Sequence, residues 1–123
     1  MAKDGEGGDA RAPGIWYRVL LPHGALGPGK VQLMRCIDET GSVSAAARRL
    51  GMSHRRSVGL VAELNALGPA PLVETKTGGE AGGGARLTPL GREVLARYDA
   101  LDRALRDAAS GPLDDLVGLL RRG

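Results

Sequence analysis

The side chains best suited to chemistry cluster in residues 41–62. This stretch contains no acidic residue, while Arg48, Arg49, Arg55 and Arg56 all lie in it. Arginine binds guanine or phosphate through a bidentate fork, which makes such a cluster suitable for contact with an anionic polymer. The whole chain carries a formal net charge of only +3, so the positive charge is local. The block fits a surface that meets phosphate, although a solvated basic helix has the same composition.

Patterns typical of enzymes and metal sites are weak in this chain. His23 and His54 lie far apart and Cys36 is the only thiol, which is not the spacing of a zinc site. Cys36 falls on the apolar face of an expected helix, so we expect it to be a buried core residue. The glycine-rich segment at residues 76–84 lacks the lysine-serine/threonine ending of a P-loop. We therefore expect no enzymatic activity, no cofactor and no metal.

Composition also limits the cellular compartment in which we expect the protein. One cysteine allows no internal disulfide, and no run of about 18 apolar residues could span a membrane. Residues 1–13 combine glycine with charge and have no apolar signal segment, so we expect a disordered tail there. These features favour a cytoplasmic protein without a membrane partner.

Glycine and proline divide the first half of the chain into short elements. We expect a strand at 15–21, a loop at 23–29, and helices at 30–39, 44–50 and 54–67. Ser44 and Ser53 are the expected N-caps of the second and third helices, and Gly51 ends the second. Val58 and Val61 are expected to fill the angle between these two helices.

The second half begins with an expected hairpin. Strands at 72–75 and 85–87 flank the glycine-rich segment. Thr88 as N-cap and Pro89 in the first turn then begin a long helix, which the Ser110-Gly111-Pro112 sequence is expected to end. A short amphipathic helix is expected within residues 111–123.

The order of elements predicts a mainly α protein with a small β-hairpin. This is the order of a winged helix-turn-helix with a long C-terminal helix, and we place that domain at residues 14–110. Two helices joined by a three-residue turn cross steeply and present the first turn of the second helix, which fits the major groove of duplex DNA. The residues that we expect to contact DNA from these helices are Ser44, Ser53, His54, Arg55, Arg56, Ser57 and Gly59.

Two further expectations concern Gly59 and the hairpin. A glycine in mid-helix costs about 1 kcal/mol relative to alanine. We expect it to allow close approach of DNA or of the second helix, or to be a packing glycine without function. The hairpin serves as the wing, whose expected contacts with a neighbouring phosphate or the minor groove are Lys76, Thr77, Gly78, Gly79 and Arg86.

Two segments resemble known regulators. GSVSAAARRLGMSHRRSV, at residues 41–58, resembles the helix-turn-helix of LysR-type regulators. LVETKTGGEAGGGARLTPLGREVLARYDAL, at residues 72–101, is similar to the N-terminal domain of ModE-type molybdate-responsive regulators, in its strand, its glycine wing and the leucine-threonine start of its helix. The matching positions are Thr77, Gly78, Gly79, Gly82, Gly83, Gly84, Leu87, Thr88 and Gly91.

The resemblance implies a homodimeric transcriptional regulator that binds double-stranded DNA, with the helix at about 88–109 joining the protomers. Val94, Tyr98, Leu101 and Leu105 recur at alternating spacings of four and three, as a helix–helix seam requires, although the same face can pack on its own core. Members of the family carry C-terminal oxyanion-binding domains, and we expect none in this chain. Any small-molecule effector is left open.

Two other functions stay compatible with the sequence. A winged helix can dock an acidic protein through its basic face instead of binding DNA. Alternatively, the glycine wing can be the site of a stand-alone oxyanion or metabolite sensor.

Overall fold

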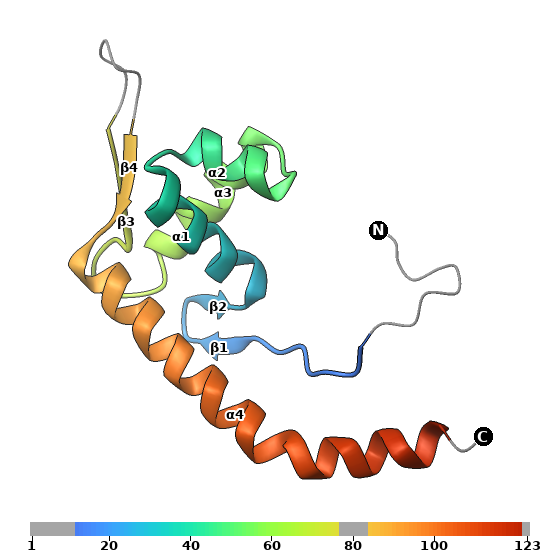
Figure 1. The fold of residues 1–123 in the computed structure, drawn as a ribbon. Coiled ribbons are helices and arrows are strands. Elements are labelled where there is room, and N and C mark those ends of the chain that lie inside the picture. Colours follow the sequence, from blue (N-terminus) through green and yellow to red (C-terminus); the bar gives the residue numbers. More distant parts are fainter. Residues whose placement is uncertain (1–11, 77–83, 122–123) are drawn as a thin grey trace. The chain divides into compact units, whose positions relative to one another are not determined.

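The structure is a computed structural model that describes residues 12–76 and 84–121 (Figure 1). The chain divides into two units, one of Tyr17–Leu101 and a smaller one that combines Met1–Trp16 with Asp102–Gly123. Most of the tail expected to be disordered lies outside the described residues.

The larger unit contains the expected helices and hairpin. In chain order the elements are β1 (Val19–Leu21), β2 (Gly24–Leu26), α1 (Pro28–Thr40), α2 (Val43–Leu50), α3 (His54–Asn65), β3 (Val73–Lys76), β4 (Gly84–Leu87) and α4 (Pro89–Arg121), whose later part belongs to the smaller unit. β1 pairs antiparallel with β2, and β3 with β4. This confirms a mainly α fold with a small hairpin, a winged helix-turn-helix.

The N-terminal strand differs from the prediction. Only Val19–Leu21 of the expected strand at 15–21 is a strand, and the expected loop at 23–29 contains β2. The chain reverses in a two-residue turn after Leu21, and Gly24 leaves that turn at a φ of 151°, which favours glycine. This turn chemistry pairs the two short segments and leaves the apolar run before them outside any strand.

The caps of α2 and α3 agree with the prediction only in part. Ser42, not Ser44, caps α2, because the Ser42 Oγ accepts a hydrogen bond of 3.1 Å from the N–H three residues later. Ser53 caps α3 as expected, with an equivalent bond of 3.0 Å. Gly51 ends α2 in the left-handed region, at a φ of 69°. The short turn that follows brings the two helices together at the crossing.

The prediction that α4 ends before Pro112 is wrong. The helix continues to Arg121 with Pro112 inside it, so the separate short helix expected at 111–123 is the last part of α4. A proline removes one helical hydrogen bond, here the bond to the carbonyl of Ala108. Pro112 and Ala108 are both exposed, so water can satisfy that carbonyl.

The core of the larger unit lies between α1, α3, the β3–β4 hairpin and the start of α4. Its largest fully buried apolar side chains are Leu33, Met34, Ile37, Leu64, Leu72 and Leu87. Cys36 is buried in the same core, as expected.

The start of α4 is held tightly against the end of the α3–β3 connection. Thr88 caps the helix as expected, its Oγ1 accepting from the Gly91 N–H at 2.9 Å, and its own N–H donates to the Leu72 carbonyl at 2.9 Å. A Cβ at position 91 would overlap that carbonyl oxygen. Only glycine therefore allows α4 to begin this close to β3.

Asn65 ties the end of α3 to the start of β3. Its Nδ2 donates to the Val73 carbonyl at 3.1 Å, and its Oδ1 accepts from the N–H groups of Leu72 and Val73, each at 2.9 Å. Leu72 and Val73 are buried, so water cannot replace these bonds easily. One side chain thus fixes the hairpin relative to α3.

We expect Asn65→Ala to lower the free energy of unfolding by about 2–4 kcal/mol, because three backbone groups lose their partner in a region that excludes water. Urea denaturation followed by circular dichroism measures the change. Asn65→Asp keeps the acceptor for both N–H groups and should lose clearly less. A loss below about 0.5 kcal/mol for the alanine variant would contradict this role of Asn65.

Candidate nucleic-acid interface

The first turn of α3 is exposed. Ser53 caps the helix, and the apolar side chains of Val61 and Leu64 turn the opposite face toward the core. Arg55 and Arg56 are therefore directed to solvent, as the sequence predicts. Among residues 12–76 and 84–121, neither arginine forms an ion pair.

Ser57 does not belong to this exposed surface. It is fully buried, and its Oγ donates to the His54 carbonyl at 2.6 Å. The expectation that Ser57 contacts DNA is therefore wrong. Residues 57, 61 and 64 share one face of the helix, and this spacing could have placed Ser57 with Val61 and Leu64 in the core.

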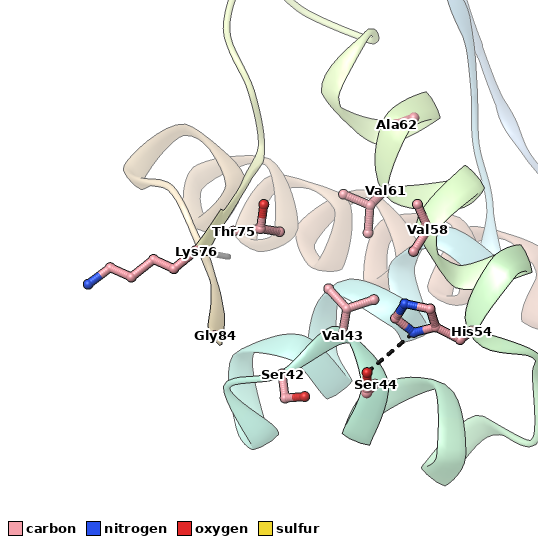
Figure 2. Close-up of a pocket in the computed structure, with 10 residues that line it drawn as sticks. All are labelled: Ser42, Val43, Ser44, His54, Val58, Val61, Ala62, Thr75, Lys76 and Gly84. Atoms are coloured by element: carbon pink, nitrogen blue, oxygen red, sulfur yellow. Dashed lines mark hydrogen bonds between the residues drawn. The ribbon is translucent and has the colours of Figure 1, made fainter. Parts of the chain in front are cut away.

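Ser44 and His54 lie side by side where α2 and α3 cross. The Ser44 Oγ is 3.3 Å from the His54 Nδ1, and both residues are exposed (Figure 2). The contact joins two of the residues that the sequence selected, each near the start of its helix. Their hydrogen-bonding groups face the same open side of the molecule.

The basic block is not uniformly available. Arg49 of α2 pairs with Glu39 of α1, so an acidic group outside the acid-free stretch offsets its charge. Arg48 is exposed and makes no ion pair within the described part of the chain. The uncompensated charge at this surface thus comes from Arg48, Arg55 and Arg56.

The hairpin carries two of the predicted basic contacts. Arg86 of β4 stands opposite Glu74 of β3, and its Nε donates to the Glu74 Oε1 at 2.7 Å. This hydrogen bond and the attraction of the carboxylate raise the pKa of Arg86. Lys76 is exposed and has no carboxylate partner in the region that the structure describes, so it is the more available cation.

Thr77, Gly78 and Gly79 lie outside the described residues, as does most of the glycine segment considered as an oxyanion site. Their predicted contacts stay predictions.

A groove of about 480 Å³ separates α3 from the hairpin. It is lined by Ser42, Val43, Ser44, His54, Val58, Val61, Ala62, Thr75, Lys76 and Gly84 (Figure 2). Val58 and Val61 of α3 lie on one side of it and Val43 of α2 points toward them, while the Lys76 side chain extends away from all three. Its walls therefore combine an apolar floor with a polar and basic rim.

Val58 is the residue of this groove whose position was predicted wrongly from the sequence. It was expected to fill the angle between α2 and α3, yet 49% of it is exposed, against 8% of Val61. Val58 lies four residues after His54, and this helical spacing is the signal that could have placed it on the exposed side.

The residues expected at a dimer seam divide into two pairs. Val94 packs on the core. Tyr98 is 8% exposed, and its ring stacks on the ring of Tyr17 with 6.0 Å between the ring centroids. These two serve the core of their own unit, which was the alternative considered, and Tyr98 is not available to a partner. Leu101 and Leu105 are 40% and 39% exposed.

In the described ranges, no three histidine, cysteine, aspartate or glutamate side chains gather closely enough to hold a metal ion. No helix in the same ranges combines the length and apolar character needed to cross a bilayer.

Known proteins resemble the part of the chain that runs from α1 to the first turn of α4. Residues 29–92 match the family described as bacterial regulatory helix-turn-helix protein, lysR family. The chain is 44% identical over 102 residues to the molybdenum-pterin-binding protein MopB of Rhodobacter capsulatus, covering 81% of this chain and 37% of MopB. It is 35% identical over 101 residues to the transcriptional regulator ModE of Yersinia pestis, covering 77% and 38%.

A third relative is the DNA-binding transcriptional dual regulator ModE of Escherichia coli K12. It is 33% identical over 102 residues, which cover 77% of this chain and 39% of that protein. The chain therefore spans less than two fifths of the length of these relatives.

Proposed function

Because the chain belongs to the lysR family of bacterial regulatory helix-turn-helix proteins, we propose that it binds a specific sequence of double-stranded DNA and regulates transcription. The observation that supports this most is the exposed first turn of α3, whose two adjacent arginines have no carboxylate partner in the described chain. Because bacterial DNA lies in the cytoplasm, we propose that the protein is cytoplasmic.

In the proposed complex, α3 is the recognition helix and enters the major groove by its N-terminal turn. Arg55 and Arg56 are long enough to reach base edges, where a guanidinium binds guanine through two hydrogen bonds. The Ser53 Oγ already accepts from the Arg56 N–H, which leaves its O–H to donate to a phosphate. Specificity then comes from the arginines and position from the serine.

The start of α2 and the hairpin flank the recognition helix. Ser44 and His54 lie together at the helix crossing and are proposed to contact the DNA backbone. Lys76 and Arg86 are proposed to reach a neighbouring phosphate, with Lys76 the stronger contact because Glu74 already engages Arg86. Gly59 completes the proposed surface, and Ser57 is omitted because it is buried.

A homodimer is part of the proposal. Two identical helix-turn-helix domains read two half-sites of a palindromic operator, which raises both affinity and specificity. Leu101 and Leu105 lie one helical turn apart on α4 and are exposed, which supports them as the contact between protomers. Burial of leucine side chains is the expected driving force.

We expect Arg55→Ala with Arg56→Ala to weaken binding to the preferred site by at least about 30-fold, because each arginine supplies a base or phosphate contact. The preferred site is first selected from genomic fragments, and fluorescence anisotropy at several salt concentrations measures the affinity. For each arginine that contacts phosphate, the slope of log Kd against log salt should fall by about one.

Arg92→Ala with Arg97→Ala is the control with the same change of charge, on α4 instead of α3. It should retain most of the affinity. If the Arg55/Arg56 variant binds as tightly as the wild type, or if both double variants lose affinity equally, α3 is not the recognition helix.

The dimer predicts a separate result. Leu101→Glu with Leu105→Glu puts like charges into the proposed seam, and the mass in sedimentation equilibrium should fall from that of a dimer to that of a monomer. Leu20→Glu, at a residue of β1 that is 76% exposed, should leave the dimer intact. A wild-type protein that is monomeric at micromolar concentration would exclude this seam.

A further inference from the structure

Beyond its first turn, the exposed face of α3 carries no polar side chain until Glu63. The exposed positions that follow Arg55 and Arg56 are Val58, Gly59 and Ala62. Glu63 itself is engaged by Lys30 of α1, whose Nζ lies 2.9 Å from its Oε1. The middle of this helix therefore presents an apolar surface of low relief directly beside two uncompensated arginines.

No contact in the described structure explains Val58 and Gly59. Apart from its chain neighbours and the backbone of α3 itself, a Cβ at position 59 would meet no heavy atom within 4 Å, and the φ of Gly59 is not positive. The sequence left open that this glycine lets α2 approach or serves internal packing, and this open space removes both explanations. A mid-helix glycine lowers helix stability relative to alanine. A valine that stays exposed contributes little hydrophobic stabilisation to the fold.

The two positions continue the surface proposed to contact bases. Val58 lies one turn after His54, and Gly59 lies one turn after Arg55. Figure 2 shows Val58 beside His54 and Val61 on the wall of the groove. Because residues 41–62 include no acidic side chain, this surface favours a polyanion over a basic protein as its occupant.

We propose that Val58 contacts the C5 methyl group of a thymine in the bound site, and that Gly59 lets α3 approach the base edges closely enough for this contact. The inference rests on the proposed function and adds a thymine preference to the arginine contacts. The thymine methyl is the apolar group that the major groove offers to a side chain. It is also the group that an exposed isopropyl side chain can recognise without a hydrogen bond.

Uracil, which lacks the methyl group, tests the contact directly. Each thymine of the selected site is replaced in turn by uracil, and Kd is measured for the wild type and for Val58→Ala. Wild-type Kd should rise about fourfold at one thymine of each half-site, the factor expected for one buried methyl group. Val58→Ala should bind the thymine site more weakly by a similar factor and show no further loss with uracil there.

Leu20→Ala is the matched control, since it truncates another exposed apolar side chain and should keep the wild-type response to uracil. If Val58→Ala responds to every uracil as the wild type does, or if no thymine responds in the wild type, the inference is overturned while DNA binding stands. A wild-type protein without salt-dependent DNA binding would overturn the proposed function and this inference with it.

Gly59→Ala separates recognition from stability. The open space at position 59 predicts a melting temperature higher by about 4 °C, together with a Kd for the selected site raised by about the same factor as in Val58→Ala. Gly118→Ala, at a mid-helix glycine of α4 that also has open space, should leave Kd unchanged. Unchanged DNA affinity of Gly59→Ala would contradict the close approach.

Discussion

The carboxamide of Asn65 is the interaction on which the geometry of this surface depends. Its Nδ2 donates to one backbone carbonyl and its Oδ1 accepts from two N–H groups at the start of β3, so one planar side chain engages three backbone groups through two different atoms. Helix α3 and the β3–β4 hairpin come from separate segments, and their hydrogen bonds to each other in the described chain run through this residue. Together with the Ala85 N–H, which donates to the Gly41 carbonyl at 2.9 Å, it positions the hairpin beside the groove.

Leu72 connects the hydrogen bonds of Asn65 to the rest of the fold. Its N–H bonds to Asn65, its carbonyl accepts from Thr88, and its side chain is buried in the core. Gly91 then seats the first turn of α4 on the same carbonyl. The end of α3, the first strand of the hairpin and the start of α4 therefore meet at one residue, so a change there displaces all three together.

Caps and breakers made most of the fold predictable, and the errors have local causes. Two serines flank Val43, and only the backbone conformation decides that Ser42 is the cap of α2. Proline ends most helices, but Pro112 lies at an exposed position where water has access to the carbonyl that loses its helical bond. Serine is typical of surfaces, yet Ser57 satisfies its hydroxyl within its own helix and is fully buried. Such local compensation leaves no signal in composition, and for Ser57 the signal was its helical spacing with Val61 and Leu64.

The residues of α3 divide sharply into those that pack on the core and those that face outward. Ser57, Val61 and Leu64 are buried and hold the helix on the core. The outward face combines like charges with a glycine, which lowers the stability of the free protein. Residues that are unfavourable for the stability of the free protein are expected at surfaces that bind a partner. Because the two faces share no side chain, the outward residues can change what the helix recognises while the core stays the same.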